Sequence, residues 1–488
     1  MISFIAALLH GGGVKRYMNY KKNNEEYKKH LWLSAIKLFH ILASVFIFYI
    51  FWMLFRYGQL FPVKHTGFRY NYFVTVGYGM GLFFFNRTYN SYLLGYSRIR
   101  ELAFAEFLSQ LFSSVIIYGI VFIGWNHWEF SYWFLVMFAV DAIFNLLWAY
   151  NATGFYFRLY SPKKTILVYR NKLDKYRFGS IKGKPSERLY KITNELMYDG
   201  SFKDLKKELA GYDAIFVAGV NSRCRNGILK YCKEEAVPGF FLPHVGDVIM
   251  QEAMHIQSFD SPVFFVNRTS LKPEYRIIKR TFDIIASLLG IIILSPIMAV
   301  TALAIHFYDG GPSLYKQVRL TRDGKKFKIW KFRSMRVDAE KDGVARLSTG
   351  DKDDRITPIG KFVRKCRLDE LPQLFNILMG DMSVVGPRPE RPEIAEQYYK
   401  TLPDFKLRLQ VKAGLTGYAQ VYGKYNIDPY EKLEFDLLYI NNMGILTDLK
   451  LMFATFRVLF SSESTTGVAG VTAMDYESGE EKAGEKRA

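Results

Sequence analysis

Cysteine is scarce in this 488-residue chain: only Cys224, Cys232 and Cys366 occur, and no two of them have C-x-x-C spacing. A disulfide framework and a structural zinc site are therefore disfavoured, and the aqueous part of the chain is expected in a reducing cytosol. Acidic residues are in deficit as well, because 46 Asp and Glu stand against 66 Lys and Arg and leave a net charge of +20. This excess indicates nucleic acid, anionic lipid or phosphorylated substrates as partners, and composition alone does not choose among them.

Long apolar runs, in contrast, are present near the N-terminus. Four stretches have about the 20 residues that a helix needs to span a bilayer: residues 33–55, 72–95, 104–125 and 130–150. The flanks before the first stretch and after the fourth are both basic, so both are expected on the cytoplasmic side. We predict that residues 1–152 form a transmembrane domain of four helices. Two interpretations stay open for Asp141 in the fourth stretch: a functional intramembrane carboxylate, or a residue that only faces the bundle or the interface.

Between residues 153 and 273, short apolar runs alternate with amphipathic stretches. Strands are predicted at residues 165–169, 213–218, 239–242 and 262–266, and helices at residues 187–197, 202–208 and 222–235. This order predicts a Rossmann-like parallel α/β domain. No G-x-G-x-x-G turn follows any of these strands, so close approach of a pyrophosphate to the backbone is not provided for. A structural or regulatory role is therefore favoured for this domain.

Another apolar run covers residues 284–305, and an ideal helix of this length, about 33 Å, is long enough to cross a bilayer. Near its middle, Pro296 removes a backbone donor and Ser295 is able to satisfy a freed carbonyl, so the helix is expected to bend there. One interpretation is a re-entrant helix over residues 280–306 that enters the cytoplasmic leaflet and returns. The other is a kinked full span, and the residues alone do not decide between the two.

Two adjacent acids, Asp369 and Glu370, lie just before Pro372, whose fixed φ suits the first turn of a helix. A helix N-terminus favours anions such as the phosphate of a substrate. Neighbouring carboxylates can share a divalent cation, or divide the roles of nucleophile and metal ligand. The alternative interpretation is ordinary charge at a helix N-terminus.

Basic residues surround this pair in rigid or alternating contexts. Arg388 lies between two prolines in GPRPE, which suits bidentate recognition of phosphate, although a turn with a solvated arginine has the same sequence. Arg319, Lys331 and Arg333 occur among aromatic residues, as in a strand with a basic face. Several basic motifs that converge on an acid pair beside a membrane helix favour a site that handles phosphate.

Five segments together resemble the polyprenyl-phosphate hexose-1-phosphate transferases, the large monotopic phosphoglycosyl transferases of bacteria. These segments are KRTFD (279–283), Ser295-Pro296, LDELPQL (368–374), GDMSVVGPRPE (380–390) and GLTGYAQVYG (414–423). The resemblance covers about residues 274–460. It implies a membrane protein with a four-helix transmembrane bundle, a Rossmann-like α/β middle domain at residues 153–273, and an α/β catalytic domain with a re-entrant membrane helix at residues 274–461. Residues 462–488 have no apolar periodicity and are expected to form a disordered tail.

The resemblance implies an enzyme that transfers a hexose 1-phosphate from a UDP-sugar to undecaprenyl phosphate and releases UMP. The reaction initiates exopolysaccharide or capsule synthesis at the bacterial inner membrane, with the middle and catalytic domains in the cytoplasm. Asp369 corresponds to the family's nucleophile, which forms a covalent sugar-phosphoryl aspartate, and Glu370 completes the dyad. Mg²⁺ is implied as the cofactor, with Glu370 and Asp369 as its candidate ligands.

Further roles follow from the same resemblance. A phosphate contact is implied for Arg388, with Lys331, Arg333, Arg319 and Lys412 as further candidates, and the family's helix break corresponds to Ser295 and Pro296, which favours re-entry. The implied partners are a UDP-sugar, undecaprenyl phosphate and membrane lipid, without nucleic acid, and a homodimer is reasonable. Glucose and galactose are both plausible sugars, and no motif distinguishes them.

Two competing interpretations stay open. A membrane-anchored nucleotide-sugar-modifying enzyme requires a Gly-rich dinucleotide turn, which is missing from the middle domain, and a Tyr-x-x-x-Lys pair. A membrane scaffold for polysaccharide assembly requires neither an acid pair nor a metal. Replacement of Asp369 separates these interpretations from the transferase.

Overall fold

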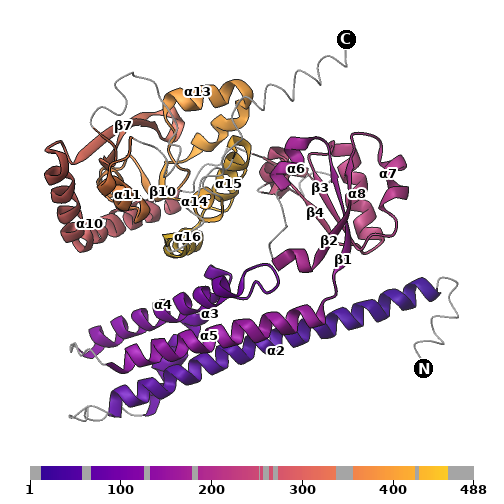
Figure 1. Cartoon of the computed structure of the whole chain (residues 1–488), viewed down its shortest axis with the longest axis horizontal. Helices are drawn as coiled ribbons and strands as arrows, with labels where there is room; N and C mark the ends of the chain where they lie inside the picture. The colour runs from indigo at the N-terminus through magenta and orange to yellow at the C-terminus, as the bar shows by residue number, and fades with distance from the viewer. Residues whose placement is uncertain are drawn as a thin grey trace. The chain divides into compact units, whose positions relative to one another are not determined.

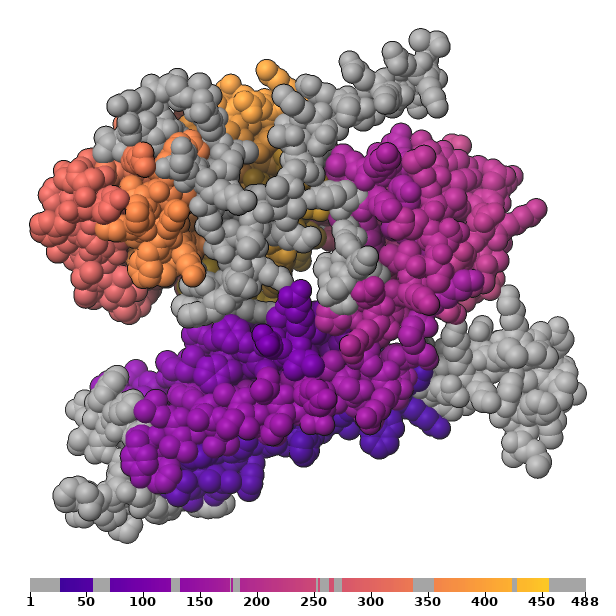
Figure 2. Space-filling view, in the orientation of Figure 1, coloured from indigo at the N-terminus to yellow at the C-terminus, as the bar shows by residue number. Residues whose placement is uncertain are grey.

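A computed structural model of the chain describes residues 13–57, 68–125, 132–178, 185–251, 253–256, 263–266, 273–336, 355–423 and 428–459. The chain divides after Leu242 into an N-terminal unit and a C-terminal unit. Figure 1 gives the helices and strands of each unit, and Figure 2 gives their surfaces by position along the chain.

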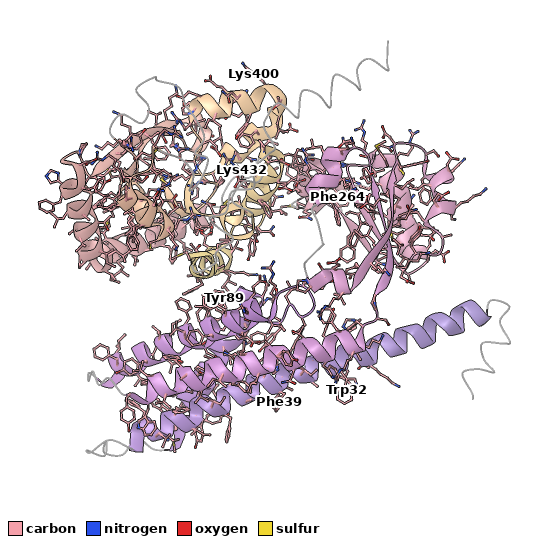
Figure 3. The ribbon with its side chains drawn as sticks, in the orientation of Figure 1. Trp32, Phe39, Tyr89, Phe264, Lys400 and Lys432 are labelled. Carbon is pink, nitrogen blue, oxygen red and sulfur yellow. The ribbon has the colours of Figure 1, made fainter. Side chains whose placement is uncertain are left out.

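Four long helices form the first part of the N-terminal unit: α2 (Gly13–Tyr57), α3 (Phe68–Tyr89), α4 (Ile99–Trp125) and α5 (Tyr132–Leu159). They run side by side, with α2 against α3 and α5, and α4 against α3 and α5 (Figure 1). Many of their large apolar side chains are exposed, as are Trp32 (60%) and Phe39 (63%), labelled in Figure 3. An apolar exterior on a helix bundle is suited to lipid.

Four described helices are long and apolar enough to cross a membrane, and three of them lie in this bundle: Tyr27–Phe55, Ile99–Ile123 and Tyr132–Leu159. The fourth is Glu274–Asp309 in the C-terminal unit. Helix α3 forms where the sequence predicts a helix. Over its described residues, however, it is not among the helices that are long and apolar enough to cross a membrane. Its glycines and polar residues, such as Asn71, Thr75 and Asn86, interrupt the apolar run.

The second part of the N-terminal unit is a parallel four-stranded sheet with the order β2-β1-β3-β4. Its strands are β1 (Lys163–Tyr169), β2 (Tyr190–Met197), β3 (Ala214–Ala218) and β4 (Gly239–Phe241). Helices α6 (Lys172–Phe178), α7 (Phe202–Leu209) and α8 (Ser222–Glu234) and the short η1 (Pro185–Arg188) connect them. The side chains of Ser201 and Asn221 cap α7 and α8. This confirms the predicted parallel α/β region.

One predicted helix in this region is wrong, because residues 190–197 form strand β2. Burial alternates along β2, with period two, and the strand pairs in parallel with β1 from Tyr190 to Met197. Pairing with β1 therefore overrides a sequence that also fits helical spacing. A second difference concerns β6 (Val263–Phe265), which pairs antiparallel with β5 (Met254–Ile256) and does not join the parallel sheet.

The C-terminal unit begins with α9 (Val245–Gln251), which the sequence assigns to the middle domain. Val245 and Val248 are buried in a core with Phe405 of η5 (Pro403–Gln410) and Leu433 of α15 (Pro429–Asn441). These contacts explain why the unit boundary lies at residue 242, some 30 residues before the predicted one.

The rest of the unit surrounds this core. A hairpin of β7 (Leu314–Leu320) and β8 (Lys326–Phe332) is followed by α11 (Pro358–Lys365), η4 (Leu368–Glu370) and α12 (Gln373–Met379). A short parallel pair, β9 (Ser383–Val385) and β10 (Gly414–Thr416), flanks α13 (Pro392–Thr401), and α14 (Tyr418–Tyr422) and α16 (Ile445–Leu459) complete the described part.

Helix α10 (Pro273–Asp309) is assigned as one helix with Pro296 inside it, and Ser295 donates a hydrogen bond to the carbonyl of Ile292 at 2.8 Å. Near its start, the Arg280 guanidinium donates to the last carbonyls of α12, and the Asp283 carboxylate accepts from the backbone and hydroxyl at the start of β9. Near its end, Met298 and Ile305 pack with Phe332. Both parts of α10 are thus attached to the same unit.

Candidate active site

The acid pair lies in a single tight turn between two helices. After α11, Arg367 adopts a left-handed conformation (φ 56°), and Leu368–Glu370 then form the short η4. Pro372 occupies the N-cap position of α12, which confirms that the acids precede a helix. A non-glycine residue in this backbone region stores strain, and such strain concentrates at functional sites.

Two cations contact Glu370. Its Oε1 lies 2.7 Å from Nη2 of Arg388 and 3.6 Å from Nζ of Lys331. Lys331 is on β8, which lies beside η4, and Arg388 is in the loop after β9. The structure therefore brings together four of the residues that the sequence singles out, Asp369, Glu370, Arg388 and Lys331.

These neighbours shift the ionisation of the two acids in opposite directions. Burial alone would raise the pKa of Glu370, but Arg388 and Lys331 outweigh it and hold the pKa well below its ordinary value. Burial and the adjacent Glu370 raise the pKa of Asp369, against a weaker opposing effect of the nearby cations. Glu370 is thus a firmly ionised carboxylate, and Asp369 is a carboxylate with a less stabilised negative charge.

The backbone around Arg388 is held by two other arginines. Nη2 of Arg408 donates to the Arg388 carbonyl at 2.7 Å, and Nη1 of Arg319 donates to the Pro389 carbonyl at 3.1 Å. Burial lowers the pKa of Arg319 to about 10. Arg319 therefore holds the backbone of the loop that carries Arg388.

Glycines let this loop approach the next motif closely. A Cβ on Gly414 would lie 2.1 Å from the backbone nitrogen of Gly386, and one on Gly386 would lie 2.5 Å from the Lys412 carbonyl oxygen. Two backbone hydrogen bonds join these segments, from Gly386 N to Thr416 O (2.8 Å) and from Gly414 N to Pro387 O (2.9 Å). These two glycines serve contact between backbones.

A buried charge network, which the sequence did not reveal, supports Arg408. Its Nε and Nη2 each lie 2.7 Å from Oδ2 of Asp436, and Nη1 lies 3.7 Å from Oε1 of Glu390. Lys432 also contacts Glu390, at 2.7 Å. One signal was available: Leu433, Asp436, Leu437 and Ile440 have helical spacing, so Asp436 lies on an apolar stripe.

The remaining candidates lie elsewhere in the unit. Arg333 is buried, forms an ion pair with Asp309 at the end of α10, and has no described contact with the acid pair. Burial lowers the pKa of Lys412. Its charge also interacts with those of Arg280, Asp283, Arg322 and Asp381. Ser295 and Pro296 lie within α10.

No group of three or more His, Cys, Asp or Glu side chains that could hold a metal occurs among the described residues. The acid pair supplies two carboxylates on consecutive residues. Mg²⁺ is usually bound by one or two carboxylates together with substrate phosphates, so this donor set fits it when a diphosphate is present.

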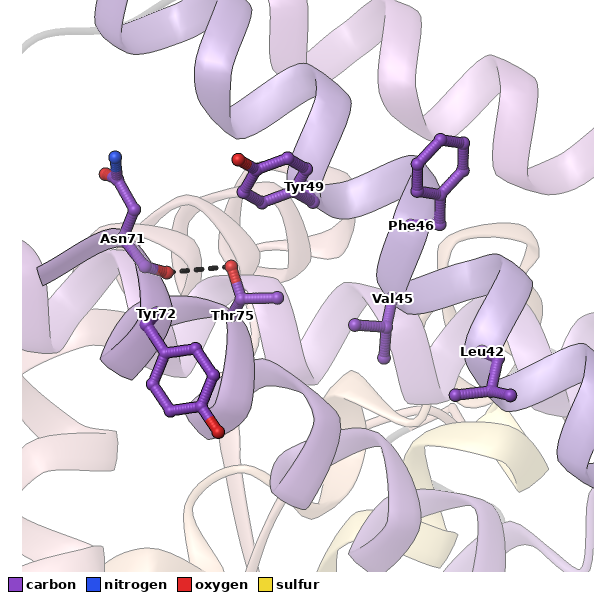
Figure 4. Close-up of a pocket in the computed structure, with 7 residues that line it drawn as sticks. All are labelled: Leu42, Val45, Phe46, Tyr49, Asn71, Tyr72 and Thr75. Atoms are coloured by element: carbon purple, nitrogen blue, oxygen red, sulfur yellow. Dashed lines mark hydrogen bonds between the residues drawn. The ribbon is translucent and has the colours of Figure 1, made fainter. Parts of the chain in front are cut away.

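A pocket is also present in the helix bundle of the N-terminal unit. Its lining comes from α2 and α3: Leu42, Val45, Phe46, Tyr49, Asn71, Tyr72 and Thr75 (Figure 4). The lining is mainly apolar, and the described polar contact within it joins the Thr75 hydroxyl to the Asn71 carbonyl at 2.8 Å. This pocket contains none of the predicted site residues.

A family model described as bacterial sugar transferase matches residues 274–462. A UDP-glucose:undecaprenyl-phosphate glucose-1-phosphate transferase of Klebsiella pneumoniae is 45% identical over 202 residues, 40% of this chain and 41% of the relative. An undecaprenyl-phosphate galactose phosphotransferase of Salmonella typhimurium is 39% identical over 201 residues, 38% of this chain and 41% of the relative. A putative undecaprenyl-phosphate N-acetylgalactosaminyl 1-phosphate transferase of Bacillus subtilis is 47% identical over 136 residues, 28% of this chain and 75% of the relative. The chain thus covers less than half of the first two relatives' length and three quarters of the third.

Proposed function

The chain belongs to the bacterial sugar transferase family, and from this premise we propose that it transfers a hexose 1-phosphate from a UDP-sugar to undecaprenyl phosphate and releases UMP. The observation that carries the proposal is the acid pair with Arg388 and Lys331 on Glu370, inside the matched region. Initiation of exopolysaccharide or capsule synthesis is the role that this product suits.

Asp369 is the proposed nucleophile. Its carboxylate attacks the β-phosphorus of the UDP-sugar, the bond to the oxygen of the α-phosphate breaks, and UMP leaves with the electron pair. A phosphate oxygen of undecaprenyl phosphate then attacks the same phosphorus and displaces the Asp369 carboxylate. Poor stabilisation of the Asp369 charge supports this role, because a less stabilised carboxylate is a better nucleophile.

The cations beside Glu370 are the proposed diphosphate ligands. The Arg388 side chain is 39% exposed, so its guanidinium is accessible to a substrate while one nitrogen still contacts Glu370. Lys331 supplies a second positive charge, 3.6 Å from the same Glu370 oxygen. Phosphate contacts by Arg333, Arg319 and Lys412 are the weaker part of this proposal, since each has another described interaction.

Mg²⁺ is the proposed cofactor, with Glu370 and Asp369 as its protein ligands. When bound, it neutralises charge on the diphosphate. Glu370 remains ionised across the physiological pH range because of its cationic neighbours, which suits a metal ligand.

We propose that α10 is re-entrant at the inner face of the bacterial cell membrane and that the catalytic unit is cytoplasmic. On a straight helix, Arg280 and Ile305 would lie about 38 Å apart. Both residues contact other parts of the C-terminal unit. Between them, Ile285, Ile292 and Val300 are more than half exposed. An exposed apolar face of this kind is suited to lipid, and attachment at both ends supports re-entry. Labelling by an impermeant thiol reagent from outside intact cells, at cysteines introduced after residue 305, would contradict the proposal.

Replacement of Asp369 by Asn tests the reaction. The full chain in lipid nanodiscs, with a UDP-sugar and undecaprenyl phosphate, is expected to release UMP more than about 1,000-fold more slowly than the parent. Asp404→Asn, at an exposed position of η5, is the matched control. An Asp369→Asn protein that folds and works at the parental rate rules out Asp369 as the nucleophile.

The names of relatives with 39% to 47% identity contain three different sugars: glucose, galactose and N-acetylgalactosamine. We propose UDP-glucose and UDP-galactose as the first candidates, and UMP release from a panel of UDP-sugars distinguishes them.

A further inference from the structure

The helix bundle of the N-terminal unit contains an interior column of polar side chains. On α4 they follow helical spacing at Glu106, Gln110 and Ser114, and on α5 at Asp141 and Asn145. All five are at most 3% exposed. Polar side chains inside a membrane bundle are costly and usually mark a functional site.

At one end of the column, hydrogen bonds join His40, Tyr92, Asn145 and Gln110. His40 Nε2 lies 3.1 Å from Asn145 Oδ1 and 3.4 Å from Glu106 Oε2, and His40 Nδ1 lies 3.0 Å from the Tyr92 hydroxyl. Asn145 donates to Gln110 at 2.6 Å. Neither oxygen of Glu106 has a hydrogen-bond partner among the described residues, but His40 lies close enough to form an ion pair with it when protonated.

Two turns along α4 from Glu106, a second group of buried oxygens lies around Asp141. Neither carboxylate oxygen of Asp141 has a hydrogen-bond partner among the described residues. The Tyr78 hydroxyl, from α3, interacts with the Asp141 carboxylate of α5 and with the Ser114 hydroxyl of α4. The Tyr78 ring stacks on Phe48 with centroids 3.9 Å apart. Two unpaired carboxylate oxygens and two hydroxyls thus share one buried region.

The buried charges around Asp141 do not balance. The described titratable side chains that are buried in the bundle are His40, Tyr78, Tyr89, Glu106 and Asp141, and half-buried ones include Tyr92 and Lys37. If His40 is protonated it compensates Glu106, and an ionised Asp141 remains without a counter-charge. A buried carboxylate is stable only when it is paired, protonated or bound to a cation.

We propose that Asp141, Ser114 and Tyr78 form an intramembrane site for one monovalent cation, taken up as a proton by the carboxylate or as Na⁺ among the four oxygens. A carboxylate with hydroxyl oxygens from several helices is a ligand set that fits either ion. The site is separate from the acid pair of the C-terminal unit, and it gives the bundle a property beyond that of a membrane anchor.

Thermal unfolding of the full chain in lipid nanodiscs tests the site. Six of the seven tryptophans precede residue 150, so tryptophan fluorescence reports mainly on the bundle. Na⁺ is exchanged for choline at constant ionic strength, and pH is varied separately. A cation bound only by the folded state raises the unfolding midpoint, and we expect a rise of roughly 3 °C or more. A rise with Na⁺ at fixed pH identifies Na⁺, and a rise only on acidification identifies the proton.

Asp141→Asn is expected to abolish the response while Glu101→Gln, at the exposed start of α4, retains it. Glu106→Gln should also retain it, which separates the site from the His40 pair. If Asp141→Asn does not fold, Ser114→Ala provides the second variant and is expected to reduce the shift at least by half. A parent that responds to neither ion overturns the proposal, as does a response that survives in Asp141→Asn or is unchanged in Ser114→Ala.

Discussion

Asp436 provides the sharpest test of how the site is held together. It is 1% exposed, and its carboxylate accepts two contacts of 2.7 Å from Arg408, which itself holds the carbonyl of Arg388. Asp436→Asn keeps the size of the side chain and removes its charge. We expect this change to destabilise the C-terminal unit and to loosen the loop that positions Arg388 against Glu370.

The magnitude follows from what remains beside Arg408. Loss of one partner of a buried ion pair costs about 3–5 kcal/mol. Glu390 still lies 3.7 Å from Arg408, so the cost should be near the lower end, about 3 kcal/mol. For a unit of this size, 1 kcal/mol lowers the midpoint by about 2–4 °C, which gives a decrease of about 6–12 °C.

Circular dichroism melting and UMP release measure the two consequences. At a temperature where both proteins are folded, kcat/KM should fall about tenfold, as expected for a loss of about 1.4 kcal/mol in positioning. Asp404→Asn should change neither quantity, because Asp404 is exposed. An unfolding midpoint within 2 °C of that of the parent corresponds to about 1 kcal/mol or less. Such a result would refute the role assigned to the Arg408–Asp436 pair.

Three further outcomes are expected. Arg388→Ala should lower kcat/KM for UMP release by about 10- to 100-fold, since it removes the proposed charge-assisted contact with the diphosphate, whereas Lys400→Ala, exposed on α13 (Figure 3), should not. Burial alone would raise the pKa of Glu390, but its cationic neighbours lower it to about 2, so its stabilisation is present above pH 4.5 and is lost as the pH falls towards 2; Glu390→Gln should therefore flatten the acid side of a plot of stability against pH. Gly414→Ala should lower the unfolding midpoint, because its Cβ would overlap the Gly386 backbone, whereas Gly444→Ala has open space and should leave the midpoint within about 2 °C of the parent.

Most of the fold is predictable from local pattern, and its errors arise where distant residues decide. The apolar runs and the β1 and β3 strands follow from periodicity within a few residues. Residues 190–197 fit helical spacing as well, and only pairing with β1 makes them a strand. Val245 likewise has an apolar neighbourhood that suits the middle domain, and its burial against α15 assigns it to the C-terminal unit. Neither decision is contained in the local sequence.

Motifs predict the acid pair and Arg388, which the structure brings together, but they do not predict the residues that hold them. Asp369 and Glu370 are adjacent acids before a proline, and Arg388 lies between two prolines. Arg408 and Asp436 act through contacts that join residues 20 and 28 positions apart, so no short motif contains them. Buried charge on an apolar stripe, as at Asp436, is a signal that sequence reasoning can use.

The two acids also illustrate what geometry adds to a motif. As consecutive residues, Asp369 and Glu370 are equivalent candidates for nucleophile and for metal ligand, and the sequence separates them only by resemblance. The contacts separate them independently, because Arg388 and Lys331 both reach Oε1 of Glu370. The pKa of Glu370 is lowered and that of Asp369 is raised. Environments that push two adjacent pKa values apart assign different roles to the groups. On this physical ground, the carboxylate with the less stabilised charge, Asp369, is the one expected to attack phosphorus.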